Sequence, residues 1–570
     1  MIPRPWLSHY DPGVPASLAP YPERTLLDYL AETARARPEL AALVFKGTRI
    51  SAARLEELSD AFAAALAGLG VRKGDRVALL LPNCPQFIIA ELGAWKVGAI
   101  VAPLNPLYPA DELAALLARI EPETVVVLTP YYHQVKVIQP ATAVRRVIAT
   151  SIKEYLPTAA RLLFTISKES QDGHRVTIAG GDHWFHDLLE RHAHAPRPDV
   201  AVGPDDIATL LPSGGTTGTP KAVEGAHRNA VITAVQVAAW LASVTEPERD
   251  VILLPLPLFH VFGMNMVQGF AFVRRLPLAL VPNPRDVADL VATIRHERPA
   301  FFVGVPTLFN ALLTHKDVRA GKVDFTSMKL CVSGAAPLLA ETKRRFEELT
   351  RSTITEGYGL TETQTANNVN PVRGAQKIGS VGLPLPDVDV RIVDAADGAR
   401  DRPLGEVGEI VVHCPQHTTG YWRNAAETAE VLRPGPDGRR WVYTGDLGYL
   451  DDDGYLFIVD RKKDLIKIGG FQVWPREIEE VIARHPAVVE VGVAAVPDPL
   501  RGEVAKAWVV LRAGARATPE EIRAFCREHL VAYKVPAIVT LADDLPKSQV
   551  GKVLRRALAA EARQESGVRS

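Results

Sequence analysis

The segment from Ser213 to Lys221 combines residue types that bind phosphate groups. Its glycines lack a Cβ, so the backbone can adopt positive φ values and approach an anion closely. Hydroxyl side chains stand among the glycines, and Lys221 adds a positive charge. Backbone amides, hydroxyls and one ammonium group together predict a cradle for the phosphates of a nucleotide. The residues that we expect to contact phosphate are Ser213, Gly214, Gly215, Thr216, Thr217, Gly218 and Lys221.

The elements on either side of this loop are predicted from local patterns. The apolar run 207–211 predicts a strand before the loop, and a helical pattern begins near His227 after it. The Gly-Lys-Ser/Thr ending of a Walker A loop is absent, which indicates a different kind of phosphate loop. A glycine- and threonine-rich surface turn is the alternative that spacing alone leaves open.

Four further motifs follow the loop in a fixed order. They are residues 356–362 (Glu-Gly-Tyr-Gly-Leu-Thr-Glu), 443–446 (Tyr-Thr-Gly-Asp), 460–464 (Asp-Arg-Lys-Lys-Asp) and 546–552 (Pro-Lys-Ser-Gln-Val-Gly-Lys). With the loop, this series resembles the adenylate-forming superfamily, which includes acyl-CoA synthetases, firefly luciferase and the adenylation domains of peptide synthetases. One such match is weak, whereas five in order are specific. From Trp6 onward the chain most resembles bacterial long-chain fatty acid–CoA ligases.

The resemblance implies two half-reactions. A fatty acid carboxylate attacks the α-phosphate of ATP to give acyl-AMP and pyrophosphate, and the thiol of coenzyme A then displaces AMP. Because the first step brings two anions together, electrostatic stabilisation is the main task of the site. The resemblance also implies Mg²⁺ at Thr217 and Glu362, since a hard cation between phosphates takes oxygen ligands. A solvated loop carboxylate is the alternative for Glu362.

The resemblance assigns the nucleotide to residues of three motifs. Tyr358 would stack on adenine, Thr361 would face the α-phosphate, and Asp446 would accept both ribose hydroxyls, with Arg461 supporting the sugar or a phosphate. A buried structural tyrosine and an ordinary turn aspartate remain open for Tyr358 and Asp446. The other residues implied to surround the nucleotide are Gly334, Ala335, Ala336, Glu356, Gly357 and Gly359.

Lys552 is the residue that we expect to bridge the substrate carboxylate and the α-phosphate. The register Pro-Lys-x-x-x-Gly-Lys selects it over Lys547, although a solvated lysine in a basic region is the alternative. The resemblance implies a C-terminal domain that swings between the half-reactions, with Lys463 at the hinge. The residues implied to line the pantetheine tunnel are Lys467, Gly469 and Gly470.

His260 lies in an aromatic segment that resembles the one beside the acyl pocket. We group it with the catalytic residues for positioning rather than acid–base chemistry, and a core histidine is the alternative. Val303, Gly304 and Val305 would form the pocket wall, where Gly304 leaves room for a chain. This pattern favours a long aliphatic acid over an aromatic one.

Composition limits the class of protein. The chain has 570 residues, 47% of them hydrophobic and 23% charged, which is typical of a globular protein with roughly three to five packed units. A net charge of −1 with no basic block argues against nucleic acid as a partner. Four scattered cysteines exclude a disulfide scaffold and a cysteine-rich zinc site, and fit a reducing cytoplasm.

No signal peptide is recognisable. The uncharged run 251–273 is interrupted by proline and glycine, so we expect a strand, a turn and a buried helix there rather than a membrane span.

The order of elements predicts an α/β fold. Short β-rich runs alternate with helical patterns up to residue 333, which implies parallel sheets covered by helices. Short strands between turns follow over 381–456, and a compact α+β arrangement begins after 460. With the resemblance, this predicts stacked α/β subdomains and a small β-rich one in a domain 1–460, followed by a small mobile α+β domain 461–570.

Several questions stay open at this level. Residues 155–168 are mainly apolar with a few basic residues between them. They predict either a helix on a bilayer surface or a helix packed on the rest of the protein. Peripheral contact with the inner face of the membrane and a homodimer are left open. Pro212, Ala222 and Glu224 depart from the usual family residues around the phosphate loop, which predicts a stiffer entry and a more negative exit. An acyl-AMP ligase that loads a carrier protein, and an inactive lipid- or nucleotide-binding relative, are the rival functions.

Overall fold

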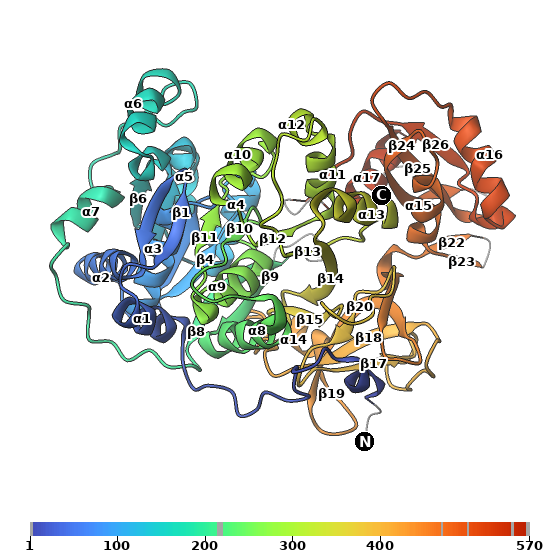
Figure 1. Ribbon diagram of the computed structural model, residues 1–570, viewed down its shortest axis with the longest axis horizontal. Coiled ribbons are helices and arrows are strands. Elements are labelled where there is room, and N and C mark those ends of the chain that lie inside the picture. Colours follow the sequence, from blue (N-terminus) through green and yellow to red (C-terminus); the bar gives the residue numbers. More distant parts are fainter. Residues whose placement is uncertain (1–3, 214–220, 469–470, 499–500, 549–551, 566–570) are drawn as a thin grey trace. The chain divides into compact units, whose positions relative to one another are not determined.

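The computed structural model describes residues 4–213, 221–468, 471–498, 501–548 and 552–565 (Figure 1). The chain forms two compact units. The larger unit comprises Leu7–Asp389 and His413–Val442, and the smaller unit comprises Met1–Trp6, Val390–Val412 and Tyr443–Ser570.

The first sheet of the larger unit has seven strands in the order β7-β6-β5-β3-β4-β8-β9. All neighbouring pairs are parallel except the hairpin of β8 and β9, in which Ser213 pairs with Lys221. The two ends of the phosphate loop are therefore fixed by strand pairing. The strands are β3 (Arg76–Leu80), β4 (Ile100–Pro103), β5 (Thr124–Leu128), β6 (Arg146–Thr150), β7 (His183–Trp184), β8 (Ile207–Ser213) and β9 (Lys221–Ala226).

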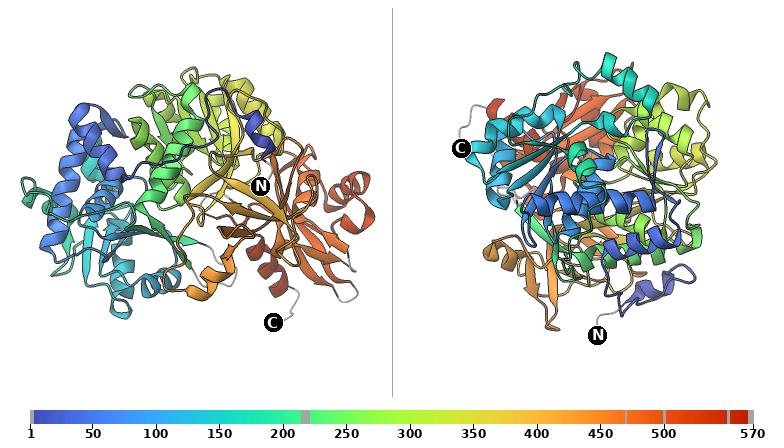
Figure 2. Two further views of the ribbon diagram at one scale, coloured as in Figure 1. Left: turned by 90° about the horizontal axis from the view of Figure 1, so that it is seen from below. Right: turned by 90° about the vertical axis from the view of Figure 1, so that its left-hand side faces the viewer.

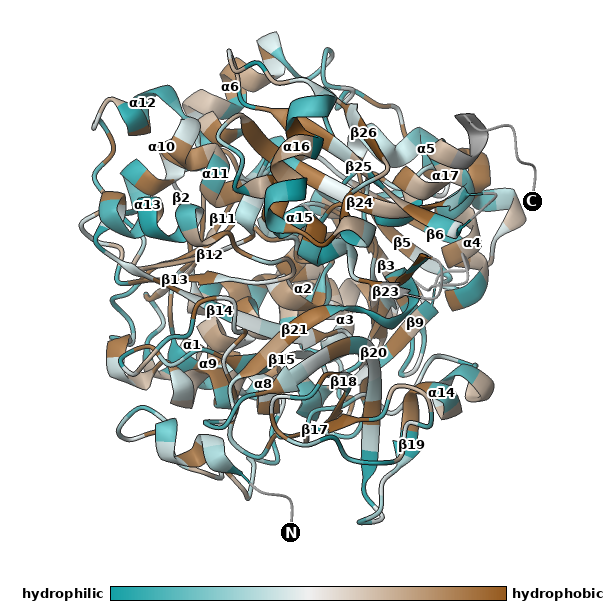
Figure 3. Ribbon diagram, turned by 90° about the vertical axis from the view of Figure 1, so that its right-hand side faces the viewer, coloured by the Kyte–Doolittle hydropathy of each residue, from teal (hydrophilic) through white to brown (hydrophobic). Residues whose placement is uncertain are grey.

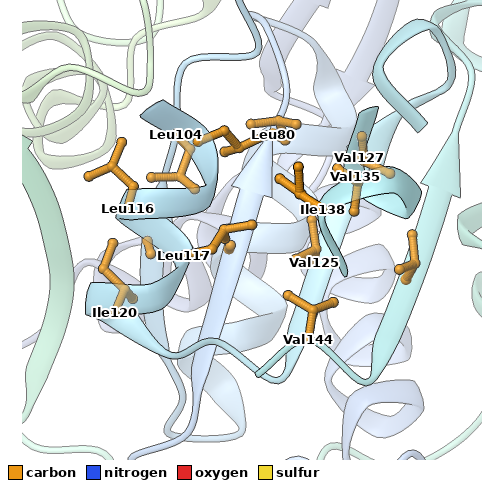
Figure 4. Close-up of a cluster of buried hydrophobic side chains, with 14 of the residues drawn as sticks. Leu80, Leu104, Leu116, Leu117, Ile120, Val125, Val127, Val135, Ile138 and Val144 are labelled. Atoms are coloured by element: carbon orange, nitrogen blue, oxygen red, sulfur yellow. The ribbon is translucent and has the colours of Figure 1, made fainter. Parts of the chain in front are cut away.

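Helices lie against this sheet (Figure 2). On one face, leucine and isoleucine side chains of α4 meet valines of β5 and α5 in a buried apolar cluster (Figure 4). Burial of each such side chain contributes about 1.5–3 kcal/mol, so this cluster holds the strands in register below the phosphate loop. The helices are α2 (Ala52–Gly68), α3 (Pro85–Lys96), α4 (Ala110–Ile120), α5 (Tyr132–Ile138) and α7 (Phe185–Arg191). The same part of the chain contains α6 (Thr158–Ser167), none of whose residues is buried.

The second sheet of the larger unit has nine strands in the order β16-β15-β14-β13-β12-β10-β11-β1-β2. Its central strands, from β1 to β14, are parallel, and the pairs at its edges are antiparallel. The strands are β1 (Ala41–Phe45), β2 (Thr48–Ser51), β10 (Ile252–Leu254), β11 (Leu278–Leu280), β12 (Phe301–Gly304), β13 (Leu330–Ser333), β14 (Thr353–Leu360), β15 (Thr365–Val369) and β16 (Leu383–Pro384).

The uncharged run 251–273 folds as strand β10, a buried π-helix η6 (Phe262–Gln268) and helix α9 (Gly269–Arg274). Among the described residues no helix is long and apolar enough to cross a membrane. The expectation of a strand, a turn and a buried helix is confirmed, with a π-helix between them. The remaining helices of this unit are α1 (Leu26–Ala36), α8 (His227–Trp240), α10 (Val287–Glu297), α11 (Pro306–Thr314), α12 (Lys316–Arg319), α13 (Ala340–Thr350) and α14 (Ala425–Val431).

The β-rich texture after residue 381 corresponds to a third, antiparallel sheet. Within the smaller unit, β20 pairs with β21, and this pairing sets Asp446 opposite Arg461. The strands are β17 (Asp389–Val393), β18 (Gly408–His413), β19 (Leu432–Pro434), β20 (Arg440–Leu450) and β21 (Leu456–Arg461).

A fourth sheet, in the order β23-β22-β25-β24 with β26 beside β25, forms the C-terminal part of the smaller unit. Its long strands β24 and β25 are mainly hydrophobic (brown in Figure 3). Helices α15 and α16 share one apolar cluster with the sheet, and α17 shares another through Leu558, Ala562 and Trp508. The predicted α+β arrangement is confirmed. The elements are β22 (Ile466–Ile468), β23 (Phe471–Val473), β24 (Val488–Asp498), β25 (Gly502–Leu511), β26 (Ile538–Leu541), α15 (Pro475–Ala483), α16 (Pro519–His529) and α17 (Arg555–Glu565). Short 3₁₀ turns are η1 (Pro5–His9), η2 (Thr129–Tyr131), η3 (Gln139–Ala141), η4 (Ile152–Tyr155), η5 (Ala242–Val244), η7 (Lys462–Asp464) and η8 (Ala532–Lys534).

A buried carboxyl group joins α3 to the end of η6. Neither Glu91 nor Gln268 is exposed, and the amide of Gln268 donates a hydrogen bond to Glu91. The Oε1 atoms of both side chains have no partner among the described residues. A proton on Glu91 would join these two oxygens, and burial raises the pKa of Glu91 to about 8.

We therefore expect Glu91→Gln to raise the melting temperature more at about pH 8.5 than at about pH 5. The folded unaltered protein retains a proton that the unfolded chain releases above a pKa of 4.5. Its free energy of unfolding should fall as pH rises from that value to about 8, by about 1.4 kcal/mol per pH unit, and the amide variant lacks this loss. Thermal unfolding at both pH values measures the difference, with the exposed Glu430→Gln as control. Equal shifts at the two pH values would contradict the expectation.

Candidate active site

The carboxyl ends of three parallel strands bring distant motifs to one edge of the nine-stranded sheet. Gly304 of β12 pairs with Ser333 of β13, which pairs with Glu356 of β14. Gly334 follows directly and donates its N–H to the carbonyl of Gly304 at 3.3 Å. Parallel strands end at the same edge, where α/β folds commonly bind ligands. The pocket-wall and adenine-side segments expected from the sequence therefore lie together.

Glycine is required at this edge because the ring of Phe262 occupies the space that a Cβ on Gly334 would need. The next residue, Ala335, has a φ of 65°, in the left-handed region. Val303 and Val305 are buried on either side of Gly304. The backbone at Gly334 is thus closed on one side by Phe262, whereas the neighbouring Ala335 is exposed.

His260 lies just before η6 and is half-buried. Its Nδ1 accepts a hydrogen bond from the N–H of Phe262 at 3.2 Å. Burial lowers the pKa of His260 to about 4, so the ring is neutral at pH 7. A neutral ring that holds the start of η6 supports the positioning role and argues against acid catalysis.

The carboxylate of Glu362 lies beside the entry to the phosphate loop. Its Oε1 accepts hydrogen bonds from the hydroxyl of Tyr421 at 2.8 Å and from Ser213 at 3.4 Å. No described residue donates to its Oε2. Two motifs 149 residues apart thus meet at one carboxylate.

Tyr421 is a residue of this site that the sequence analysis missed. It is buried, forms a bridge with Val223 in β9, and burial together with the Glu362 carboxylate raises its pKa well above the ordinary value. The segment Gly420-Tyr421-Trp422 has no chemical signature of its own. Only the pairing with β9 identifies it.

Lys221 lies on the same tyrosine. Its Nζ is 5.0 Å from the centre of the Tyr421 ring and 3.3 Å from the carboxylate of Glu427 in α14. The ammonium group is therefore oriented by an aromatic face and one anion at the exit of the phosphate loop.

The two sequence departures beside Lys221 have structural roles. Ala222 is fully buried in the cluster below the sheet, where a larger side chain would not fit without displacement. The carboxylate of Glu224 accepts a hydrogen bond from Thr419 at 2.6 Å. The negative charge that Glu224 adds is thus hydrogen-bonded to the segment 418–420.

Strand β14 carries most of the motif 356–362. Tyr358 is half-buried, and the backbone carbonyl of Thr365 occupies the space that a Cβ on Gly359 would need. The carboxylate of Glu356 accepts a hydrogen bond from the N–H of Leu338 at 3.4 Å. These contacts shape the loop that leads through Thr361 to Glu362.

In the smaller unit, the ribose candidates and the catalytic lysine candidate are neighbours. Asp446 is buried, and its Oδ1 is 3.1 Å from the Nε of Arg461. The backbone of Lys552 is held by Ser548, whose N–H donates to its carbonyl at 2.7 Å. The surrounding protein and the charge of Arg461 lower the pKa of Lys552 to about 8, although the residue as a whole is exposed and Asp446 opposes the shift.

The segment expected to form the hinge is tied to the helices that follow it. Asp460 is buried and accepts hydrogen bonds from the N–H of Arg476 at 2.9 Å and from the guanidinium of Arg555. Arg555 also pairs with Glu479 at 2.6 Å. The sequence analysis treated Arg555 only as part of a basic region, so this contact was missed.

The remaining candidates are exposed or lie outside the described residues. Lys463, in η7, and Lys467, in β22, are exposed, and the N–H of Lys467 donates to Glu503 at 2.8 Å. The pKa of Lys463 is lowered, because its ammonium group is partly buried although the residue as a whole is exposed, and because the charge of Arg461 lies nearby. Gly214, Gly215, Thr216, Thr217, Gly218, Gly469 and Gly470 are outside the described part of the chain, and their contacts stay predictions.

Comparison with known proteins identifies the family. The family model for the AMP-binding enzyme matches residues 30–422, and that for the AMP-binding enzyme C-terminal domain matches residues 477–552. The chain is 37% identical over 561 residues to a long-chain-fatty-acid–CoA ligase of Bacillus subtilis, covering 98% of both chains. It is 38% identical over 559 residues to one of Yersinia pestis, covering 97% of both. The crystal structure of ATP-bound MatB from Rhodopseudomonas palustris has a TM-score of 0.80 at 29% identity, covering 95% of this chain and all of that one. The chain belongs to the family of AMP-binding enzymes.

Proposed function

We propose that this protein is an ATP-dependent long-chain fatty acid–CoA ligase. It converts a fatty acid and ATP to acyl-AMP and pyrophosphate, and then transfers the acyl group to coenzyme A with release of AMP. The observation that carries the proposal is the meeting of Glu362 with Ser213 at the foot of the phosphate loop. Relatives aligned over nearly their full length support the fatty acid as substrate.

ATP is bound in this proposal by the residues that the motifs supply. The phosphate loop, with Thr217, takes the phosphates, Tyr358 stacks on adenine, and Asp446 with Arg461 takes the ribose. Thr361 and Lys552 face the α-phosphate. The positive charges of Lys221 and Lys552 offset the repulsion between the substrate carboxylate and the triphosphate.

Mg²⁺ is the metal that the site would hold, through Glu362 and Thr217. Mg²⁺ takes one or two protein carboxylates and completes its shell with phosphate oxygens and water, and Glu362 would supply such a carboxylate. The metal would neutralise phosphate charge. Tyr421 orients the carboxylate by its hydrogen bond to Oε1.

The acyl and thiol sites complete the proposal. The fatty acid lies along Val303, Gly304 and Val305, with His260 positioning the wall as a neutral ring. Coenzyme A enters beside Lys467 and Gly469–Gly470 after the domain 461–570 swings about Lys463 relative to the domain 1–460.

The proposed function is tested by incubating the purified protein with ATP, Mg²⁺, coenzyme A and fatty acids of graded length. The ligase proposal predicts pyrophosphate release together with acyl-CoA, detected by mass spectrometry. Pyrophosphate release with acyl-AMP but no acyl-CoA would favour an acyl-AMP ligase that loads a carrier protein. Absence of both products would leave a binding protein.

The surface of α6 supports peripheral contact with a membrane. None of its residues is buried, and Leu162, Leu163 and Ile166 are 63%, 67% and 77% exposed on one face. Arg161 on the same helix and Lys168 directly after it are also exposed. An apolar face with flanking cations is typical of helices that lie in a bilayer interface, and we propose a cytoplasmic enzyme that collects fatty acid there. A homodimer is also proposed, and sedimentation equilibrium tests it.

Replacing Leu162, Leu163 and Ile166 together with serine is expected to lower binding to anionic phospholipid vesicles by about tenfold or more, because three aliphatic side chains lose their burial in lipid. Vesicle co-sedimentation measures the change. Val137→Ser is the matched control, since this valine is 76% exposed on α5. Equal binding by the triple variant and the control would reject the membrane role.

A further inference from the structure

The loop after Glu362 has an unusual backbone. Gln364 has a φ of 52° and Thr365 a φ of 116°, so two consecutive residues other than glycine occupy the left-handed half of conformational space. Both are buried. Such a backbone persists only where its surroundings determine it, and it often lies at a functional site.

The side-chain amide of Gln364 reaches three segments. Its Nε2 donates to the carbonyl of Thr361 at 3.3 Å and to the carbonyl of Glu224 at 3.2 Å. Its Oε1 accepts from the amide of Asn265 at 2.8 Å. One side chain therefore joins the loop that bears Glu362, the strand β9 that leaves the phosphate loop, and the π-helix η6.

Packing around this amide allows little movement. A Cβ on Gly225 of β9 would lie 2.7 Å from Gln364 Oε1 and 2.5 Å from Thr209 Oγ1, so a larger residue there would displace one or both side chains. Thr233 of α8 donates its hydroxyl to the carbonyl of Gln364 at 3.2 Å, and Thr365 donates to the carbonyl of Val261, which precedes η6, at 3.0 Å. Hydrogen bonds with β9, α8, η6 and the residue before η6 therefore hold the loop that follows Glu362.

We infer that Gln364 is a positioning residue that couples the metal and phosphate side of the site to its acyl side. Its amide sets the direction in which the chain enters Glu362, and the same amide fixes Asn265 in η6, directly after the segment that contains His260. The inference rests on the proposed function, because it takes Glu362 as the Mg²⁺ ligand and η6 as part of the acyl pocket. Gln364 itself contacts neither reactant in this scheme.

Two substitutions separate the two sides. Gln364→Met removes all three contacts with a side chain of similar length. It is expected to raise the Mg²⁺ concentration for half-maximal activity by about tenfold, because loss of a residue that supports a metal ligand commonly weakens metal binding by that much. It is also expected to raise KM for the fatty acid. Asn265→Leu removes only the contact with η6. It is expected to raise KM for the fatty acid and leave the Mg²⁺ dependence unchanged.

Gln236→Met is the matched control. Gln236 is a fully buried glutamine of α8 that donates to the carbonyl of Pro386 at 2.8 Å and to the hydroxyl of Tyr21 at 3.3 Å. Its loss should lower the melting temperature without changing the Mg²⁺ dependence or KM. Gln364→Asn keeps the amide on a shorter side chain, so it should fold even if Gln364→Met does not. It is expected to raise the Mg²⁺ requirement too, but by less than Gln364→Met does.

Initial rates of acyl-CoA formation against Mg²⁺ and fatty acid concentration decide the matter. An unaltered protein that forms no acyl-CoA would refute the proposed function itself. An active unaltered protein, combined with Gln364 variants whose Mg²⁺ dependence equals that of Gln236→Met, would overturn this inference alone. A raised Mg²⁺ requirement confined to the Gln364 variants supports it.

Discussion

Lys552→Ala is expected to slow formation of acyl-AMP about 100- to 1,000-fold, because a charge that meets the reacting phosphate is lost. Formation of acyl-CoA from supplied acyl-AMP should continue at nearly the unaltered rate, since the proposed swing removes this lysine before the thiol attacks. Isotope exchange between pyrophosphate and ATP measures the first half-reaction, and thioester formation from synthetic acyl-AMP measures the second. Equal loss of both would refute the role.

The control for this substitution is Lys547→Ala. Lys547 lies five positions before Lys552 and pairs with Glu490 and Asp544, each at 2.7 Å. The substitution removes a lysine from the same motif without touching the proposed reaction centre, so both half-reactions should keep their rates. A loss equal to that of Lys552→Ala would mean that the motif as a whole, rather than one ammonium group, matters.

The pH dependence gives a second readout for Lys552. Its surroundings lower its pKa to about 8, so the ammonium form declines as pH rises through that value. The rate of acyl-AMP formation should fall over the same range. Lys552→Arg stays charged and should lose this alkaline decline even if its rate is lower. The same decline in both proteins would assign it to another group.

Glu362→Gln is expected to lower the rate of acyl-AMP formation about 100-fold and to raise the Mg²⁺ requirement. The amide has the same shape and can still accept the hydrogen bond from Tyr421, but it lacks the charge that binds a hard cation. Rates measured over a series of Mg²⁺ concentrations give both effects. Glu430→Gln, at an exposed position of α14, is the control for removal of one negative charge.

An unchanged Mg²⁺ requirement in Glu362→Gln would exclude Glu362 as the metal ligand. Loss of activity without that change would instead point to the loop geometry, since Thr418 also donates its N–H to the Glu362 carbonyl at 2.8 Å. The two outcomes separate the carboxylate from the backbone of the same residue.

Periodicity and motif order predicted most of the architecture. The run 207–211 lies in β8 (Ile207–Ser213), and the helical pattern expected to begin near His227 forms α8, which begins at that residue. Resemblance predicted the order of the subdomains and the family, and both are confirmed by the comparisons. These signals are local or lie in short motifs, which is why one sequence carries them. The domain boundary at 460 and the site roles stay predictions.

The contacts that the sequence did not predict join residues far apart in the chain. Tyr421 reaches Glu362 across 59 positions, Gln364 reaches Glu224 across 140, and Arg555 reaches Asp460 across 95. Each depends on the angle at which two strands or helices pass, and no periodic pattern encodes that angle. The π-helix η6 was missed for a related reason, since its extra residue per turn leaves an apolar run that looks like any buried helix.

The binding of Asp460 has a consequence for limited proteolysis. Arg461, Lys462 and Lys463 follow it directly and are three consecutive sites for trypsin. A protease needs an extended, locally unfolded segment. These three residues do not form such a segment as long as Arg476 and Arg555 hold Asp460 and β21 pairs with β20. A conformer that releases Asp460 would open all three peptide bonds, so the speed of nicking at this point would report the position of the C-terminal domain with each substrate.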